Sequence, residues 1–555
     1  MINLYVKSCL LLFIIMMPKS LKKTKLRSND LNVIDHWMRN WVSFSDILFG
    51  YAARLFFCFF YQIIKGDGKK SVKNQRKILR YLVWKIKDTQ IWREFNFDGI
   101  YKSEDIYSQF SSKIPIFEPS GYRKYVDLAK NEKNIVWPWK IGKFSISSWT
   151  TGNKKYIPVT KEAMKSTTKA WLYMFAYLIH RFPWLKIFRW DFFPLTWSIQ
   201  ESKDWMEAWD VSALILKARK WISASRYSLP EEVLLNPNWS NKLECVLKGI
   251  NVYRENTMVW VTSRAYEILK YMESNDKKKF VEFTKNMELI IWWWVDSAPF
   301  MHYFKEFNIN CFSAYNSAEW CFAFQDVENY DNINWDAPYM LLTNHWIFYE
   351  FLEFNWKNFD ENWNIRKNAK AKPVWELNCT DVWKNFALII TTNGWLVRYL
   401  LWDVVSFVDD NLRFKIAWRT RQSINLKWEE LMETHVNSVI NKLSNDDGIS
   451  ITYYTIWPDN EDWPTCHEWV IECGKKLPIS EEEFASKIDL YLQDINPDYK
   501  AKRSNNMLLK MPVIHLVKNW IFIKWMGSRG KLWAQNKVPK LSYKKDIINE
   551  IMKIS

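Results

Sequence analysis

The stretch "FSISSWTTGNKKYIPVT", from Phe144 to Thr160, decides the fold of this chain. It is typical of a β-strand that runs into a phosphate-binding loop, because hydroxyl side chains and Gly152 are followed by two lysines. Thr160 is a typical N-cap residue, so we expect a helix after it and a strand, a loop and a helix dipole that meet at one point. Trp149 conflicts with this pattern, since a loop that surrounds phosphates needs a small residue there.

Taken alone, the loop is a weak signal for a nucleotide site. Turns rich in Ser and Thr with lysines nearby are common on protein surfaces, and the spacing does not match the GxxxxGK[ST] pattern of a Walker loop. The loop therefore counts only if other parts of the chain point to the same site.

Length and composition predict a globular protein with two or more domains. The chain has 555 residues, of which 48% are hydrophobic and 25% charged. A net charge of +17 is compatible with a nucleic-acid partner, an anionic membrane or a lysine-rich proteome. We favour the last, because the lysines are scattered and the densest run, from Lys19 to Arg27, is typical of a solvated arm. We expect no nucleic-acid partner.

The glycine and tryptophan counts are both abnormal. The chain has 13 glycines and 36 tryptophans. Average usage of about 7% predicts roughly 39 glycines, so ~26 are missing. If those positions are written as tryptophan, ~10 tryptophans remain, and the two abnormalities nearly cancel.

Cysteines and apolar segments indicate the compartment. The eight cysteines include no CxxC pair, which predicts reduced thiols and a cytoplasmic protein. We also expect the protein to be a monomer. The apolar run after Lys7 is compatible with a signal-like segment or with an upstream start codon that precedes a start at Met17. A second apolar run begins at Ile47, but Arg54 interrupts it, so we expect a packing helix and no membrane association.

Periodicity divides the chain into regions. Up to about Lys140 the pattern is helical. From Phe386 it predicts an antiparallel meander of "FALIITT", "LVRYLL", "DVVSFV" and "LRFKIA", with turns at Asn393–Gly394 and 409–411. A boundary near 419–425 separates a C-terminal region, in which one helical stripe is formed by Leu431, His435, Val436, Val439, Ile440 and Leu443. Two strands, "GISITYYTI" and "CHEWVIE", and a helix that begins at a Ser480/Glu483 capping box follow.

Six blocks occur in an order that resembles a known family. They are "SSWTTGNKKYIPVT", "YNSAEWCFAFQD" (315–326), "LTNHWIFYEF" (341–351), "LVRYLLWD" (396–403), "WRTRQSINLKWEEL" (418–431) and "GKLWAQNKVPKL" (530–541). From about Asn74 onward the chain is similar to the auxin-responsive-promoter family of acyl acid-amido synthetases, a branch of the adenylate-forming superfamily.

The resemblance implies an α/β adenylate-forming architecture. A large N-terminal domain with α/β subdomains and an antiparallel β-barrel or meander would be followed by a small, mobile α+β C-terminal domain. We expect an N-terminal extension with packing helices over 1–73, the nucleotide- and acyl-binding domain over 74–418 and the mobile domain over 419–555.

The resemblance also addresses the tryptophans. The family has glycine at the positions of Trp149, Trp293, Trp294, Trp320, Trp402, Trp418, Trp428 and Trp533, but tryptophan at those of Trp137 and Trp469. We therefore interpret the sequence as a product of genetic-code reassignment, in which UGA codons that encode glycine were translated as tryptophan. UGG codons at Trp149, Trp320 and Trp402 would refute this hypothesis.

Site residues follow from the matched blocks. Ser148, Thr150, Thr151, Gly152 and Lys155 would hold the ATP phosphates, in a loop that looks one residue shorter than the usual pattern, so that Lys154 competes with Lys155 for the assignment. Tyr315 would lie beside the adenine, Glu319 would bind Mg²⁺ and Asp403 would accept hydrogen bonds from the ribose. Arg419 would stand at the hinge and Lys537 would reach the site from the mobile domain.

These residue types suit ATP-dependent adenylation of a carboxylic acid, followed by attack of an amine, with an amino acid as the expected amine. Transfer to a thiol such as coenzyme A is an alternative, and 36 genuine tryptophans would favour a non-catalytic aromatic-rich binding protein. In isolation, Glu319 and Asp403 would more often be an ion-paired carboxylate and a turn residue. His180, His345 and His467 have no metal-like spacing, and Tyr349 and Glu350 fit either the acyl site or the core.

Overall fold

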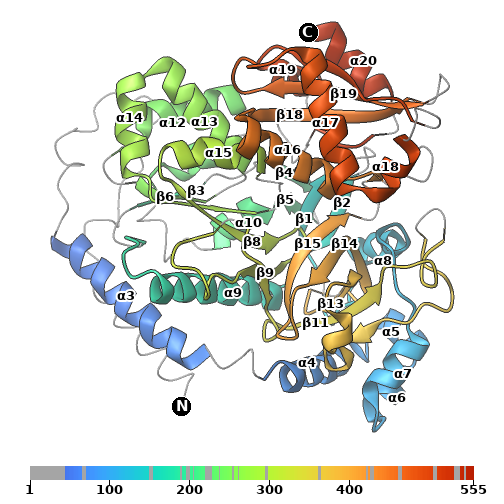
Figure 1. Ribbon diagram of the computed structural model, residues 1–555. Coiled ribbons are helices and arrows are strands. Elements are labelled where there is room, and N and C mark those ends of the chain that lie inside the picture. Colours follow the sequence, from blue (N-terminus) through green and yellow to red (C-terminus); the bar gives the residue numbers. More distant parts are fainter. Residues whose placement is uncertain are drawn as a thin grey trace.

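The structure is a computed structural model that describes residues 44–64, 70–139, 141–148, 154–187, 191–194, 200–203, 206–209, 211–218, 228–236, 238–252, 255–259, 262–293, 298–334, 336–360, 364–394, 396–419, 423–424, 431–459, 465–503, 509–529, 538–542 and 545–555. Figure 1 shows a large part built on one long sheet and a smaller C-terminal part above it.

A layer of N-terminal helices packs against the large sheet, as the helical pattern predicts. It consists of α3 (Phe44–Ile64), α4 (Ser71–Ile86), α5 (Gln90–Glu94), α6 (Phe97–Lys102), α7 (Ile106–Lys113) and α8 (Pro119–Asn131). The apolar face of α4 is buried. On α3, Arg54 donates to the carbonyls of Pro183 and Leu185, which ties this apolar helix to the body of the protein. Within the described residues, no helix is long and apolar enough to cross a membrane.

The opening stretch forms a hairpin, and one prediction about it is wrong. β1 (Lys143–Ser148) pairs antiparallel with β2 (Lys154–Pro158), and only then does α9 (Lys161–Arg181) begin. The loop therefore joins two strands, and five strand residues, about 16 Å of chain, separate it from the helix N-terminus. Thr160 does cap α9, since its hydroxyl accepts from the amide of Ala163 at 3.0 Å. The helix dipole acts at that cap and not at the loop.

One mixed sheet of eleven strands runs through the large part. Its order is β12 (Lys372–Pro373), β11 (Ile347–Glu353), β13 (Asn385–Thr392), β14 (Tyr399–Phe407), β15 (Arg413–Arg419), β10 (Tyr339–Leu341), β9 (Cys321–Gln325), β8 (Asn310–Asn316), β7 (Leu289–Trp292), β6 (Glu255–Val259) and β3 (Asp191–Pro194). In this sheet β3, β6, β7 and β8 are parallel to one another, and the other neighbouring strands pair antiparallel. The predicted meander is thus confirmed, but it continues a parallel sheet.

Two predicted strands of the meander are one strand. The segments "LVRYLL" and "DVVSFV" merge in β14, which is interrupted by irregular pairing where Trp402 has a φ of +66°. Positive φ in a tryptophan is unusual, because its Cβ crowds the backbone. The apparent break in the sequence pattern is this bulge and not a turn.

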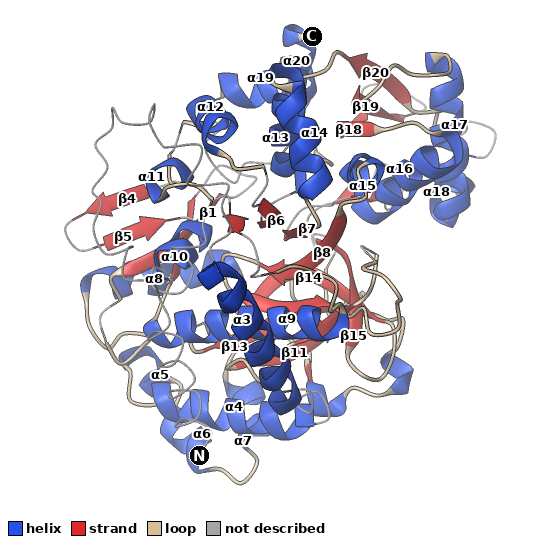
Figure 2. Cartoon of the chain, turned by 90° about the vertical axis from the view of Figure 1, so that its left-hand side faces the viewer, coloured by secondary structure: helices blue, strands red, loops and turns tan. Residues whose placement is uncertain are grey.

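Helices cover both faces of the sheet (Figure 2). One cluster joins β3, β6 and β7 to α10 (Val211–Ala218), α11 (Glu231–Leu234), α12 (Trp239–Gly249), α13 (Thr262–Asn275), α14 (Lys277–Asn286) and α15 (Ala298–Glu306). A second cluster places α3 and α9 over β7, β8 and β9. A separate four-stranded sheet has the order β2, β1, β5 (Met206–Trp209) and β4 (Gln200–Lys203). Short 3-10 helices η4 (Val374–Glu376) and η5 (Cys379–Asp381) follow β12.

The C-terminal part is a small α+β unit with its own core. β18 (Ile451–Asp459), β19 (Cys466–Cys473) and β20 (Val513–Val517) form its sheet, preceded by β16 (Ser423–Ile424) and β17 (Leu431–Met432). Its helices are α16 (Glu433–Asp447), α17 (Glu481–Ile495), α18 (Pro497–Arg503), α19 (Ile521–Ser528) and α20 (Lys545–Ile554). Ser480 caps α17 as predicted. Leu431 lies in β17, so the stripe assigned to α16 begins one turn too early.

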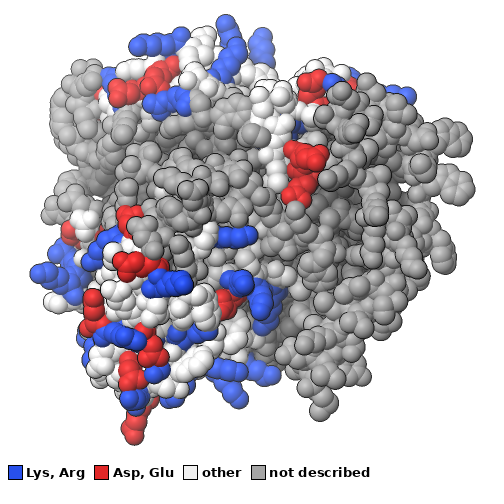
Figure 3. Space-filling model, turned by 180° about the vertical axis from the view of Figure 1, so that it is seen from behind, with Lys and Arg blue, Asp and Glu red and all other residues white. Residues whose placement is uncertain are grey.

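The distribution of charged side chains and the state of the cysteines agree with the expectations from composition. On the face shown in Figure 3, lysines and arginines lie interspersed with acidic residues over the described part. The described cysteines, of which Cys311, Cys321 and Cys466 are buried, are all free thiols.

Candidate nucleotide and acyl site

The centre of the candidate site is the tight connection between β8 and β9. Tyr315 lies near the end of β8, and the amide of Ser317 donates to the carbonyl of Trp320 at 2.8 Å, which closes a turn with Glu319 inside it. β8 is buried from Cys311 to Asn316, and the hairpin that it forms with β9 carries buried polar side chains at its tip, namely Asn316, Ser317 and Glu319. Both Tyr315 and Glu319 are buried.

Two hydroxyls orient the carboxylate of Glu319. Ser317 donates to Oε2 at 2.7 Å, and the phenol of Tyr399, from β14, donates to Oε1 at 3.4 Å. Burial and then the nearby Glu319 carboxylate raise the pKa of Tyr399, so this phenol keeps its proton and remains a donor. Neither Ser317 nor Tyr399 was assigned a role from sequence, although both lie in the matched blocks.

Asp403 is brought to the same place by β14. The phenol of Tyr315 donates to its Oδ2 at 2.5 Å, and Asp403 is only 3% exposed. The ring of Tyr315 packs against Phe322 with centroids 5.1 Å apart. Arg419, the last residue of β15, lies opposite Asp403 in the strand register, so the structure places the backbone of the expected hinge residue beside the expected ribose-binding carboxylate.

The strands of the predicted phosphate loop belong to the same core. Phe144 of β1 and Ile157 of β2 share a hydrophobic cluster with Tyr315 and Trp320. The hydroxyl of Thr160 donates to the carbonyl of Asn393 at 2.8 Å, which fixes the end of the hairpin against the turn before β14. The two strands that flank the loop are therefore anchored to the elements that carry Glu319 and Asp403.

Several predicted residues fall outside this description. Thr150, Thr151, Gly152 and Lys537 lie outside the described residues, as does Trp149. Ser148 ends β1 and pairs with Lys154, and Lys155 pairs with Ser147, as backbone positions only.

Glu350 and Tyr349 belong to the core and not to the candidate site. Arg398 binds Glu350 through two parallel hydrogen bonds, Nε to Oε2 at 3.0 Å and Nη2 to Oε1 at 2.8 Å. The guanidinium also donates to the carbonyl of Ser111 at 2.8 Å, which joins α7 to the sheet. Tyr349 is fully buried and donates to the carbonyl of Phe322.

Profiles of one family match both parts of the chain. The GH3 family N-terminal domain matches residues 61–287 and the GH3 family C-terminal domain matches residues 432–546, together more than half of the chain. The chain belongs to the GH3 family. The adenylating amido synthetases of this family are ATP-dependent ligases that act on acyl acids. A comparison with curated proteins gives no match.

Solved structures confirm the adenylate-forming fold expected for a GH3 protein. GH3.15 acyl acid amido synthetase is similar with a TM-score of 0.70 and 15% identity, over 87% of this chain and 93% of the other. The AtGH3.15 complex with 2,4-DB gives 0.70 and 14%, over 87% and 94%. A 2-hydroxyisobutyryl-CoA ligase in the postadenylation state gives 0.54 and 9%, over 87% and 92%.

Tryptophans crowd the candidate site of this GH3 chain. Trp320 follows Glu319, is 3% exposed, and its indole Nε1 finds no hydrogen-bond partner among the described residues. Trp402 precedes Asp403 at positive φ. Each stands where the sequence comparison expects glycine. The buried indoles of Trp137 and Trp469 also lack such a partner, so the missing bond does not distinguish Trp320, whereas the positive φ of Trp402 is strained for a residue that has a Cβ.

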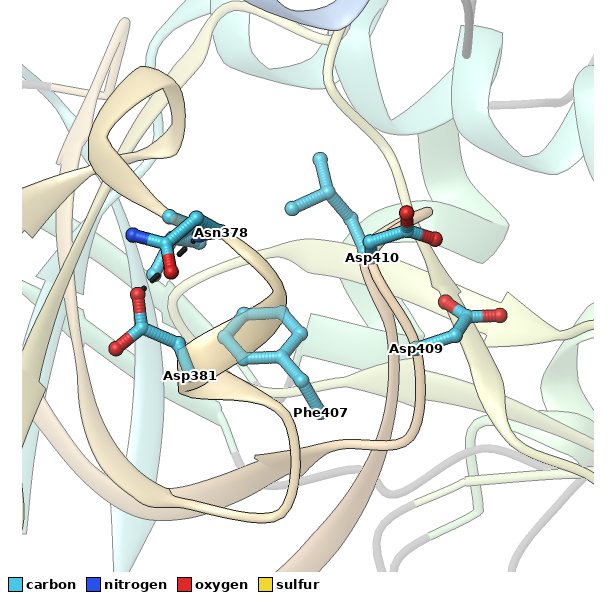
Figure 4. Close-up of a pocket in the computed structure, with 7 residues that line it drawn as sticks. Asn378, Asp381, Phe407, Asp409 and Asp410 are labelled. Carbon is cyan, nitrogen blue, oxygen red and sulfur yellow. Dashed lines mark hydrogen bonds between the residues drawn. The ribbon is translucent and has the colours of Figure 1, made fainter.

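The pocket in Figure 4 is separate from this site. It lies between η5 and the turn after β14, and it is lined by Leu377, Asn378, Asp381, Phe407, Asp409, Asp410 and Leu412. Lys372 and Lys384 pair with Asp381, and Arg413 pairs with Asp409. Burial raises the pKa of Asp381, but Lys372, the amide of Asn378 and Lys384 outweigh it and hold the pKa below its usual value. The carboxylates of Asp381 and Asp409 are therefore already paired with cations.

The carboxylate of Glu319 is the candidate ligand for Mg²⁺. Across the described ranges, no group of three or more His, Cys, Asp or Glu side chains could hold a metal ion. Mg²⁺ commonly uses one or two carboxylates together with substrate phosphates, so a single oriented carboxylate fits a Mg²⁺ that arrives with ATP. His345 is fully buried, and burial lowers its pKa to about 3, which suits a neutral core residue.

Proposed function

We propose that the chain activates a carboxylic acid with ATP to form an acyl-adenylate and then transfers the acyl group to an amine, with an amino acid as the expected amine. The observation that carries this proposal is the convergence of Tyr315, Glu319 and Asp403 in one buried cluster. Tyr315 on β8 donates to Asp403 on β14, and Tyr399 on β14 donates to Glu319 at the hairpin tip. These two hydrogen bonds join segments that are distant in sequence. The match to both GH3 domains supports the same activity.

The residues have distinct roles in this scheme. Asp403 accepts hydrogen bonds from the ribose, exchanging its contact with Tyr315, and Tyr315 lies beside the adenine. Ser148, Thr150, Thr151, Gly152 and Lys155 bind the phosphates, while Lys537 stabilises charge that develops as the acid attacks the α-phosphate and pyrophosphate leaves. Glu319, oriented by two hydroxyls, would hold Mg²⁺, which when bound neutralises phosphate charge. Arg419 marks the hinge between 74–418 and 419–555.

The first half-reaction is tested by ATP–pyrophosphate exchange with a panel of carboxylic acids. We expect exchange with at least one acid, and its loss in an Asp403→Ala variant. If no acid in the panel supports exchange, adenylation is refuted.

The second half-reaction is tested by the acceptor. Once an acid is found, an amino-acid mixture and coenzyme A are supplied separately, and the acyl product is identified by mass. Amide formation supports the proposal, whereas thioester formation alone would assign the chain to thiol acylation.

We further infer that many tryptophans of the printed sequence are glycines in the native protein. Nine non-glycine residues in the described part have positive φ, and four of them are tryptophans: Trp346, Trp383, Trp402 and Trp520. Glycine adopts this region freely, and Gly448 does so at the end of α16 with a φ of +66°, the value found at both Trp383 and Trp402. The backbone thus supports the reassignment independently of the family comparison.

Codons and stability test this inference. We expect UGA codons at these four positions. We also expect peptides of the native protein to have masses that correspond to glycine there. Trp383 is 71% exposed, so its replacement removes little packing; Trp383→Gly should stabilise the printed chain by about 1 kcal/mol in chemical denaturation. UGG codons at all four positions, with Trp383→Gly destabilising, would overturn the inference.

A further inference from the structure

A tyrosine of the C-terminal domain is hydrogen-bonded to a carboxylate of the large domain. Tyr453 lies on β18, within the segment matched by the C-terminal family profile, and Glu267 lies on α13, within the N-terminal one. The phenol of Tyr453 donates to Oε1 of Glu267 at 3.0 Å. Figures 1 and 2 show α13 and α15 beside the C-terminal elements.

The large domain holds Glu267 in place as an acceptor. Its side chain is 3% exposed, and Oε2 accepts from the indole of Trp239 at 3.0 Å and from the guanidinium of Arg264. The charge of Glu267 is therefore compensated inside its own domain, while its second oxygen is directed to the other domain. A carboxylate fixed in this way is a directional acceptor.

The ring of Tyr453 is held by both domains. Phe300, from α15, contacts its edge with centroids 6.1 Å apart, and Phe522, from α19, stacks on it at 5.8 Å. Burial and then the Glu267 carboxylate raise the pKa of Tyr453, so the phenol stays protonated and remains a donor. At the rim of the same interface, Lys475 pairs with Glu306 at 2.6 Å, but both side chains are exposed to solvent and such a pair contributes little.

The side chain of the neighbouring Tyr454 lies on the opposite face of β18. Successive side chains of a strand alternate, so Tyr454 points into its own domain, where its phenol donates to Oδ1 of Asn437 at 2.9 Å. The bond from Tyr453 to Glu267 crosses the domain boundary, whereas the bond from Tyr454 to Asn437 stays within the C-terminal domain. The pair provides a matched comparison.

We propose that Tyr453 and Glu267 form a latch that fixes how the C-terminal domain rests on the large domain, and thereby sets the balance between acyl-adenylate formation and acyl transfer. This inference rests on the proposed two-step function. Both are positioning residues, because neither is expected to touch a substrate. Loss of a hydrogen bond to a charged group changes an equilibrium by about 10- to 100-fold, which is enough to change the population of a domain arrangement.

The test uses the full chain with Tyr453→Phe, and Tyr454→Phe as the control. Pyrophosphate exchange measures the first step, and amide formation from a preformed acyl-adenylate measures the second. Tyr453→Phe should change the ratio of the two rates by about tenfold or more. Tyr454→Phe should leave the ratio unchanged. An unchanged ratio in Tyr453→Phe, or an equal change in both variants, would overturn the latch.

Small-angle X-ray scattering separates this proposal from the proposed function. Tyr453→Phe should broaden the distribution of interatomic distances, and Tyr454→Phe should not, whether or not a substrate has been found. If no acid supports exchange but the scattering differs as expected, the assigned reaction is wrong and the latch between the domains stands. Identical scattering of both variants and the parent chain would exclude the latch.

Discussion

Two buried glutamates of the large sheet are held in different ways. Glu350 on β11 is bound by the guanidinium of Arg398, whereas Glu319 at the tip of the β8–β9 hairpin is oriented by the hydroxyls of Ser317 and Tyr399. A guanidinium compensates the charge of a carboxylate, while a hydroxyl fixes the direction in which it points. The Arg398 contact therefore ties Glu350 into the core, whereas Ser317 and Tyr399 set the orientation of Glu319.

A third buried glutamate lies between these cases. Glu472, on β19, accepts from the backbone amide of Phe522 at 3.3 Å, at the N-terminus of α19. Burial nevertheless raises its pKa to about 7. Backbone amides therefore offset only part of the desolvation of this carboxylate.

The largest effect is expected at the ion pair. Arg398→Ala should reduce the free energy of unfolding by about 3–5 kcal/mol, because it leaves Glu350 buried without its partner. Chemical denaturation measures the change. As the control, Glu350→Met combined with Arg398→Met should recover most of the loss. A loss below about 1 kcal/mol in the single variant would remove the basis of the comparison.

Glu319 should show the reverse behaviour. Glu319→Gln keeps the shape but removes the charge and replaces one acceptor oxygen with an NH2 donor, so pyrophosphate exchange should fall by about 100-fold or more. The melting temperature should change little. Glu350→Gln is the matched variant, and there we expect lost stability. If Glu319→Gln melts early and retains its exchange rate, the roles assigned to the two glutamates are wrong.

Glu472 predicts a pH dependence of stability. Its pKa rises on folding from 4.5 to about 7, so the folded protein binds the extra proton between these values. Stability should therefore fall as pH rises from about 4.5 to about 7, by up to about 3 kcal/mol, and then level off.

The measurement is the difference between the parent chain and Glu472→Gln in denaturation at several pH values. The variant cannot ionise, so it should gain stability relative to the parent chain as pH rises. A difference that stays constant with pH would show that Glu472 ionises normally.

The smallest effect concerns a single hydroxyl. Ser317→Ala removes the 2.7 Å bond to Glu319, which should raise the Mg²⁺ concentration needed for half-maximal exchange by about fivefold. Ser313, on β8 four residues before Ser317, bonds Tyr339 instead and supplies the control. Ser313→Ala should leave the Mg²⁺ dependence unchanged, and an equal response of both variants would remove the special role of Ser317.

Local patterns predicted local structure well. The caps at Thr160 and Ser480 and the buried face of α4 follow from side chains within a few residues of each other. The five-residue strand β2 was missed, because a short extended segment that ends in Pro158 and precedes a helix cap has the composition of a loop. The continuity of the eleven-stranded sheet was also missed, since it depends on pairings such as β10 with β15 between distant segments.

The roles assigned to the candidate site residues stay predictions. The ordered motifs indicate Tyr315, Glu319 and Asp403, and two hydrogen bonds join the segments that carry them. The roles of Ser317 and Tyr399 could not be read from spacing, because they arise from contacts across a turn and between strands.

β14 and the residue just before it carry a core ion-pair residue, a site-orienting phenol and the candidate ribose ligand within six positions, from Arg398 to Asp403. Because side chains of a strand alternate, inserting or deleting one residue here would turn all of them to the wrong face. This segment should therefore be especially sensitive to changes in length. A library of single-codon deletions should leave almost no functional survivors between these two residues.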